Sequence, residues 1–140
     1  MRADEIMTAD VITLKTDQTL ADAIEVLSER GFRHLPVLGD AGQLVGMLSD
    51  RDLRSLGIGS AIDTPTLRKA QEQLRTSVAA TMQADVAKVT PDTELNELID
   101  TMLEAGVGAL PVVDEDSDAL LGIVSYVDVL RAVRDEAARA

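Results

Sequence analysis

The sequence predicts a mixed α/β (α+β) protein built from two β-α-β-β-α copies that pack through their sheets as a pseudo-twofold pair. The 140-residue chain repeats its own pattern once, and each copy alternates short β runs with amphipathic helices. Apolar residues make up 46% of the chain, which supports a packed core. Because the only aromatic residues are Phe32 and Tyr126, that core must consist of aliphatic side chains and methionine.

The internal repeat is the observation on which this prediction depends. At an offset of 75 residues the matched pairs are Met7/Met82, Ala9/Ala84, Asp10/Asp85, Val11/Val86, Asp17/Asp92, Leu20/Leu95, Ile24/Ile99, Gly31/Gly106 and Leu35-Pro36-Val37/Leu110-Pro111-Val112. After one inserted residue the offset becomes 76, with the pairs Gly46/Gly122, Ser49/Ser125 and Asp52/Asp128. Two copies indicate a paired arrangement, whereas a solenoid would need three or more.

Each copy begins with a short β run and an amphipathic helix. The β runs are Val11–Leu14 and Val86–Val89. Apolar residues at helical spacing predict one buried face per helix, made of Leu20, Ala23, Ile24 and Leu27 in the first copy and of Leu95, Leu98, Ile99, Met102 and Leu103 in the second. Asp17 and Asp92 are predicted to cap these helices at the N-terminus, and Gly31 and Gly106 at the C-terminus.

A β-hairpin and a second helix close each copy. The predicted hairpin strands are Arg33–Leu38 with Gln43–Leu48, and Gly108–Val113 with Ala119–Val124. Polar turns at 39–42 and 114–118 connect them. The closing helices are expected near Asp50–Leu56 and Tyr126–Ala137.

These patterns divide the chain into residues 1–56, a linker over 57–81, and residues 82–140. The linker contains glycine, serine and proline, and a short polar helix is expected to begin at Thr64 with Pro65 in its first turn. Each copy is small, and small cores are marginally stable. We therefore expect the two copies to share a core.

Charge and composition exclude several classes of function. The net charge of −12 disfavours broad binding to nucleic acid or to an anionic membrane. Residues 76–140 carry 13 acidic and four basic side chains, so an anionic ligand would approach the first half more easily. The absence of cysteine excludes thiol chemistry, and a zinc site is disfavoured because His34 is the single histidine. Without a signal-like or membrane-length apolar run, we expect a cytoplasmic protein.

The duplicated Leu-Pro-Val strand and the Gly-x-x-Ser-x-x-Asp element resemble a tandem pair of cystathionine β-synthase (CBS) domains, also called a Bateman module. The resemblance covers Met7–Leu56 and Met82–Val133. It implies a cytoplasmic regulatory sensor, not an enzyme, that binds AMP, ADP, ATP, S-adenosylmethionine or a dinucleotide in clefts. It also implies a disc-like homodimer and an unidentified regulated partner. It implies no cofactor, except Mg²⁺ where that ion accompanies a polyphosphate.

The resemblance implies ligand-binding residues in both copies. The Asp of the Ser-x-x-Asp element would accept hydrogen bonds from the ribose hydroxyls, and arginines would contact phosphate. The segment around the proline of each Leu-Pro-Val strand would flank adenine. In the first copy these residues are Thr13, Arg33, His34, Pro36, Ser49, Arg51 and Asp52. In the second they are Lys88, Gly108, Ala109, Pro111, Ser125 and Asp128. The second set has fewer cations, so we expect two sites of unequal character.

Other interpretations of the same residues remain open. Ser49 with Asp52, and Ser125 with Asp128, would also form capping boxes at helix starts, in which case the protein is a structural dimerisation module with empty clefts. The prolines could mark strand starts or edges. A nucleotide-acting enzyme is a further alternative. The acidic run Asp114–Asp118 lacks the glycine and glutamate of a calcium loop and is interpreted as a hairpin turn.

Overall fold

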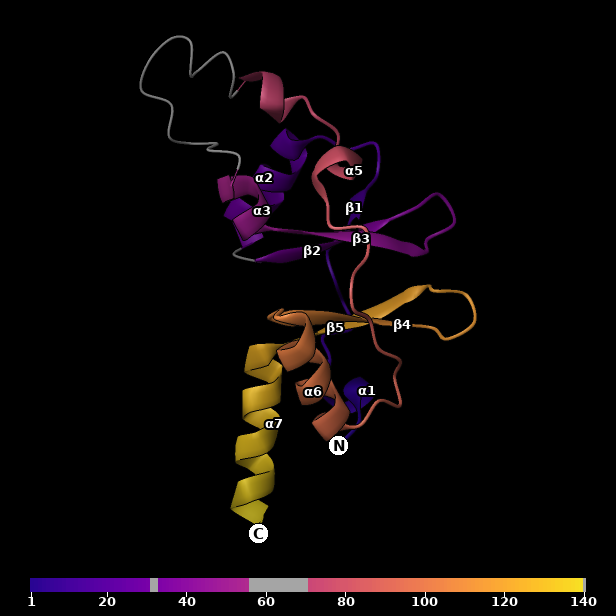
Figure 1. Cartoon of the computed structure of the whole chain (residues 1–140), viewed down its shortest axis with the longest axis vertical. Coiled ribbons are helices and arrows are strands. Elements are labelled where there is room, and N and C mark those ends of the chain that lie inside the picture. Colours follow the sequence, from indigo (N-terminus) through magenta and orange to yellow (C-terminus); the bar gives the residue numbers. More distant parts are fainter. Residues whose placement is uncertain (31–32, 56–70, 140) are drawn as a thin grey trace. The chain divides into compact units, whose positions relative to one another are not determined.

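The computed structural model describes residues 1–30, 33–55 and 71–139 (Figure 1). In chain order its elements are α1 (Ala3–Ile6), β1 (Leu14–Lys15), α2 (Leu20–Arg30), β2 (His34–Leu38), β3 (Leu44–Ser49), α3 (Asp50–Ser55), α5 (Val78–Thr81), α6 (Leu95–Ala105), β4 (Ala109–Val113), β5 (Leu120–Ser125) and α7 (Tyr126–Arg139). This mixture of helices and small sheets confirms the predicted α+β class. The linker helix expected from Thr64 lies outside the described residues.

The chain folds into two compact units. The first-copy unit comprises Ile12–Ala41 and Val45–Val86, and the second-copy unit comprises Met1–Val11, Gly42–Leu44 and Ala87–Ala140. In the first-copy unit, β1 is parallel to β2, and the strand order is β1-β2-β3. Helices α2, α3 and α5 lie on one side of this sheet (Figure 1). The core beneath them consists of aliphatic residues, namely Leu14, Leu20, Ala23, Leu35, Val37, Leu48, Leu53 and Val78.

The second-copy unit has the same plan with a smaller sheet. Strands β4 and β5 are antiparallel, with Ala109 opposite Ser125, and a register shift falls between Val112 and Val113. Val89 adds a single parallel bridge to Val112, where the sequence predicted a strand over 86–89. The core of this unit is Ala3, Val89, Leu95, Leu98, Met102, Leu110, Val112, Val124, Val129 and Ala132.

Each unit contains the opening segment of the other copy. Thr8, at the start of the chain, forms an antiparallel bridge with Ile123 of β5. At the equivalent position, Gln83 forms an antiparallel bridge with Met47 of β3. These bridges add one hydrogen-bonded segment to each small sheet. We call Met1–Val11 and Thr76–Val86 the lead segments.

The helix termini differ in part from the sequence-based predictions. The predicted N-terminal caps Asp17 and Asp92 were wrong. Thr19 begins α2 by exchanging hydrogen bonds with Asp22, at 3.0 Å and 3.4 Å between their backbone nitrogens and side-chain oxygens. Asp92 lies in the preceding turn, where the hydroxyl of Thr90 donates to it at 2.6 Å and lowers the pKa of its carboxyl.

At the other end of α6, Gly106 adopts the left-handed conformation (φ 66°) and confirms the predicted cap. Gly31 lies outside the described residues. Leu103 was assigned to the buried face of α6 and is instead 75% exposed. No helix in the described ranges has both the length and the apolar content needed to cross a membrane.

The proline of each copy lies inside a strand and not at its start. Pro36 and Pro111 are both fully buried, each third in its strand. Pairing between β1 and β2 begins at Val37, one residue beyond Pro36, so the missing proline N–H leaves no bond to β1 unformed. Pro111 uses its carbonyl oxygen to accept a hydrogen bond from the Val89 N–H at 3.0 Å.

Close contact with a lead segment explains why both copies have glycine at the matched positions Gly46 and Gly122. A Cβ atom added at Gly46 would lie 2.5 Å from the Sδ of Met82 and 2.9 Å from the carbonyl oxygen of Gln83. At Gly122 the corresponding distances are 2.6 Å to the Sδ of Met7 and 2.8 Å to the carbonyl oxygen of Thr8. The glycines are therefore required because the lead segment passes directly over the strand.

We predict that Gly46→Ala and Gly122→Ala will each lower the free energy of unfolding by roughly 1–3 kcal/mol, because a backbone oxygen as well as the methionine must move. Urea unfolding measures this loss. Gly42→Asn is the control: it has φ 81° and no atom within 4 Å of an added Cβ, and asparagine tolerates this conformation. Wild-type stability in both alanine variants would contradict the close approach.

Candidate functional site

Both units place a Ser-x-x-Asp sequence where a strand passes directly into a helix. Ser49 ends β3 and Asp52 lies in the first turn of α3. Ser125 ends β5 and Asp128 lies in the first turn of α7. Both aspartates are partly exposed, so one side of each carboxylate remains accessible.

Each serine and aspartate form a reciprocal pair of hydrogen bonds. The Ser49 N–H donates to Asp52 Oδ2 at 2.9 Å, and the Asp52 N–H donates to Ser49 Oγ at 3.2 Å. The same two bonds join Ser125 and Asp128 at 2.9 Å and 3.2 Å. This is capping-box geometry with aspartate in place of glutamate. The capping role expected as an alternative is therefore present at both junctions.

Capping engages only part of each carboxylate. An ionised carboxylate offers about four lone-pair sites, and the two hydrogen bonds that Ser125 donates to Asp128 both reach Oδ2. At Asp52, the side-chain amide of Gln83 donates to Oδ1 at 3.3 Å. An amide donor at this position occupies the place where a ribose hydroxyl could donate. Capping and ligand binding are thus compatible at Asp128, whereas at Asp52 a ribose hydroxyl would have to displace the Gln83 amide.

In the first-copy unit the start of β2 lies beside the start of α3. The Asp50 N–H donates to the Arg33 carbonyl oxygen at 3.0 Å and joins the two segments. Burial lowers the pKa of His34 below its ordinary value of 6.5, against the opposing effect of the Asp50 and Asp52 carboxylates. The positive charge of Arg33 lowers this pKa further. The structure therefore places Arg33 and Asp52 near His34, and their assignment to one binding site stays a prediction.

The remaining residues predicted in this unit lie at varied depths. Arg51 is exposed on α3, beside Asp52 in sequence. Pro36 is fully buried, so it can only shape the strand and cannot touch a ligand with its ring. Thr13 is half-buried and precedes β1, which pairs with the far end of β2 at Val37 and Leu38.

In the second-copy unit, the strand register separates the predicted residues. Gly108 and Ala109 lie at the Ser125 end of the hairpin, where the Tyr126 N–H donates to the Gly108 carbonyl oxygen at 2.8 Å. Lys88 lies at the turn end, where its Nζ forms a 2.9 Å ion pair with Asp118. Lys88 and Asp128 therefore lie at opposite ends of the hairpin. Pro111 is buried between these two ends.

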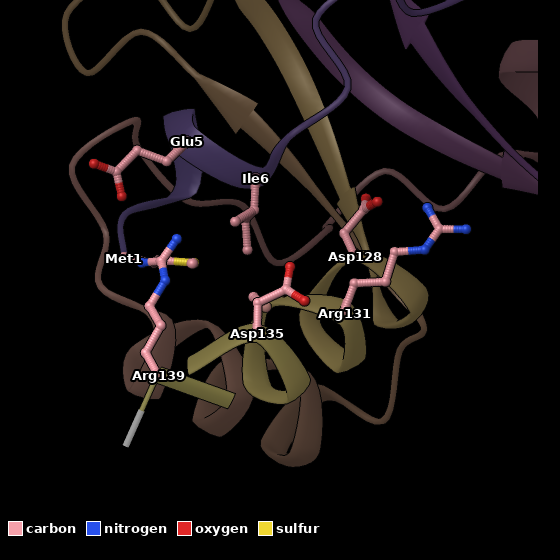
Figure 2. A pocket seen from close by; sticks show the side chains of 8 residues that line it. Met1, Glu5, Ile6, Asp128, Arg131, Asp135 and Arg139 are labelled. Carbon is pink, nitrogen blue, oxygen red and sulfur yellow. The ribbon is translucent and has the colours of Figure 1, made fainter. Parts of the chain in front are cut away.

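An open groove of about 510 Å³ borders Asp128 within the second-copy unit (Figure 2). Helix α1 contributes Glu5 and Ile6, and α7 contributes Arg131 and Asp135 beside Asp128. In Figure 2 the Arg131 and Asp128 side chains both rise from the first turns of α7. The groove therefore presents charges of both signs, with Arg131 and Arg139 beside Glu5, Asp128 and Asp135.

Two residues near the aspartates were not anticipated from the sequence. Gln83 follows Met82 and reaches Asp52 because its lead segment pairs with β3. Its position directly after a matched methionine was the available signal. Arg131 lies one helical turn after Asp128, and the 3.6-residue period could have indicated that it shares the same helix face.

Comparison with known proteins places both copies in one family. The family model described as CBS domain matches residues 3–59 and 66–135. Hypoxic response protein 1 of Mycobacterium tuberculosis is 31% identical over 135 residues, which are 96% of this chain and 87% of that protein. Inosine-5'-monophosphate dehydrogenase of Methanocaldococcus jannaschii is 32% identical over 144 residues. This match spans 99% of the chain and 26% of the enzyme, so the likeness covers about a quarter of that relative.

Solved structures agree with these matches. The CBS-pair protein CBSX2 from Arabidopsis thaliana has a TM-score of 0.82 at 28% identity, over 99% of this chain and 98% of that chain. CBSX2 in complex with AMP has a TM-score of 0.79 at 30% identity, over 96% of both chains.

We predict that protonation of His34 destabilises the protein in mild acid. Because its pKa is lower in the folded than in the unfolded state, the unfolded state binds more protons as the pH falls below about 6.5. Stability is then lost progressively until the pH passes the folded pKa. Urea unfolding at pH 7.5 and 5.5 should show a smaller loss in His34→Gln than in wild type. Equal losses in both proteins would show that His34 is not responsible.

Proposed function

Since the chain belongs to the CBS-domain family, we propose that it is a regulatory module that binds an adenosine-containing ligand beside its Ser-x-x-Asp junctions. The observation that carries this proposal is the doubled junction, in which Asp52 and Asp128 are each held at a partly exposed helix start by hydrogen bonds with the preceding serine. Vicinal ribose hydroxyls are suitable donors to such a carboxylate. The AMP complex of CBSX2, a structural relative at 30% identity, supports the same class of ligand.

We propose that the two sites differ in their preference for phosphate. Arg33 and Arg51 supply cations near Asp52, with Ser49 and His34 beside them. This set favours AMP, ADP or ATP. Near Asp128 the groove mixes Arg131 and Arg139 with Asp135 and Glu5, and Lys88 is engaged by Asp118. A less anionic ligand, such as adenosine or S-adenosylmethionine, is better matched to that second set, which includes Ser125, Gly108 and Ala109.

The proposed mechanism is a shift in population between arrangements of the units or of two associated chains. A ligand that prefers one arrangement by 1–3 kcal/mol shifts the equilibrium by roughly 5–150-fold. A partner protein would respond to that shift, so the module would regulate another activity without performing catalysis. We further propose that two copies associate as a homodimer in the cytoplasm.

Two other functions make distinct predictions. A structural dimerisation module would use the Ser-Asp pairs only as caps, and no adenosine ligand would raise its thermal stability. A nucleotide-acting enzyme would turn over ATP with Mg²⁺. The sequence offers one histidine and no cysteine for metal binding, and the described residues include no group of three or more potential metal ligands.

We predict that Asp52→Ala removes nucleotide binding in the first-copy unit and leaves the other site largely intact, while Asp128→Ala does the reverse. Each change deletes hydrogen bonds to a charged acceptor, so the affected affinity should fall about tenfold or more. Isothermal titration with AMP and with adenosine measures both sites. If neither variant changes any binding step, the assigned aspartates are wrong.

The matched control for these variants is Asp22→Ala. Asp22 exchanges the same kind of capping bonds with Thr19 at the start of α2, away from both junctions. Loss of a cap costs about 1 kcal/mol of stability, so all three variants should be similarly destabilised. Only Asp52→Ala and Asp128→Ala should lose ligand. In wild type, ligand at ten times its Kd should add about 1.4 kcal/mol of stability.

A further inference from the structure

The residue that follows the matched methionine differs between the copies, and in one copy it reaches the junction aspartate. At the offset of 75, Thr8 corresponds to Gln83. The side-chain Nε2 of Gln83 donates to Asp52 Oδ1 at 3.3 Å. Asp128 accepts hydrogen bonds from Ser125, and among the described residues the Thr8 side chain donates none to it. The two carboxylates therefore differ in whether the side chain of a lead segment contacts them.

The backbone at this position is anchored in the same way in both copies. The Gln83 N–H donates to the Met47 carbonyl oxygen at 2.8 Å, and the Met47 N–H donates back to the Gln83 carbonyl oxygen at 2.9 Å. Thr8 and Ile123 form the same reciprocal pair, at 2.9 Å and 3.0 Å. The identity of the side chain is therefore what distinguishes the two positions, and the Gln83 side chain can turn away without movement of its backbone.

The hydrogen bond between Gln83 and Asp52 is suited to exchange with another donor. Its length of 3.3 Å lies just beyond the range of about 2.7–3.2 Å that is usual for N–H···O bonds. Gln83 is exposed and Asp52 is partly exposed, so the bond lies open to solvent. The Ser49 N–H meanwhile holds the other carboxylate oxygen, Oδ2, at 2.9 Å. The carboxylate can therefore keep its orientation while the donor to Oδ1 changes.

We propose that Gln83 is an internal competitor for Asp52, whose side-chain amide occupies Oδ1 until the vicinal hydroxyls of a ligand displace it. This inference rests on the function proposed above, in which ribose hydroxyls donate to this carboxylate. The apparent affinity of a site falls in proportion to the fraction of molecules in which the site is open. Gln83 therefore lowers the affinity of the first-copy unit, and Thr8 has no such effect on Asp128.

This competition makes the first-copy site respond differently to different classes of ligand. A ligand without vicinal hydroxyls leaves the amide of Gln83 in place, so its affinity does not depend on this residue. Adenosine and AMP must both displace the amide, and their affinities fall by the same factor. AMP offsets that factor through contacts between its phosphate and Arg33 or Arg51, whereas adenosine has no phosphate. The first-copy site is thereby adjusted to fill with a nucleotide at concentrations where the nucleoside leaves it empty.

Isothermal titration of Gln83→Thr tests the competition, because this variant carries the residue that the second copy has at the matched position. The Asp128→Ala background leaves the first-copy site as the one that titrates. We expect Gln83→Thr to raise the affinity for adenosine roughly two- to tenfold and to leave that for 2',3'-dideoxyadenosine unchanged. Gln71→Thr is the matched control, since Gln71 is an exposed glutamine of the same unit that lines a separate groove. It should bind both ligands as the Asp128→Ala background does.

Two results of this titration would overturn the competition. The first is an unchanged affinity for adenosine in Gln83→Thr. The second is an equal gain for adenosine and for the dideoxy analogue, which would show that Gln83 obstructs the site by its bulk and not by holding the carboxylate. Because Gln83 is exposed, its replacement should preserve thermal unfolding, which confirms that the variant is folded.

The side-chain amide resonances of Gln83 in an NMR spectrum test the contact before any ligand is added. Asp52→Ala should move them toward the values of an exposed glutamine such as Gln71, and adenosine should produce the same change in the wild type. Resonances of Gln83 that are identical in wild type and Asp52→Ala would overturn the competition and leave the proposed function standing. If neither adenosine nor AMP binds the wild type or Gln83→Thr, the proposed function fails, and the competition fails with it.

Discussion

The passage of a lead segment over a glycine is the contact on which both units depend. At Gly46 and at Gly122 the strand has no side chain, so a methionine and a backbone carbonyl can lie directly on it. This proximity lets Thr8 and Gln83 form bridges with β5 and β3. It also brings the Gln83 amide to the Asp52 carboxylate. A side chain at either glycine would separate the sheet from the segment that widens it.

The two strand-to-helix junctions show how one pair of side chains serves stability and leaves room for recognition. Serine and aspartate satisfy backbone N–H groups at the helix start, which would otherwise lack partners. That bonding holds each carboxylate in a fixed orientation before any ligand arrives. Preorganised acceptors bind at lower entropic cost than mobile ones. The surrounding charges then differ, with Arg33 near Asp52 and a mixed-sign groove beside Asp128.

The order of elements and most of the core could be predicted because the local spacing of apolar residues indicates both. Both hairpins, both closing helices and the Gly106 cap followed from short-range patterns. Long-range pairing has no local signature, so the exchange of lead segments and the Gln83 contact were not anticipated. The ion pair of Lys88 with Asp118 was not predicted for the same reason, since the strand register brings these two distant residues together. Leu103 was misassigned because a five-residue apolar set at helical spacing was wider than the face that the sheet can cover.

The exchange of lead segments also bears on how a duplicated chain of this kind could arise. A single copy would lack the segment that crosses its own final strand, because that segment belongs to the other copy. Two separate single-copy molecules could supply it to each other, as in a domain-swapped pair. Joining the copies in one polypeptide replaces an encounter between molecules with an intramolecular one, whose effective concentration is set by the connecting residues. Each unit of the fused chain then receives its lead segment at any protein concentration. The sequences of the two copies can therefore diverge from each other.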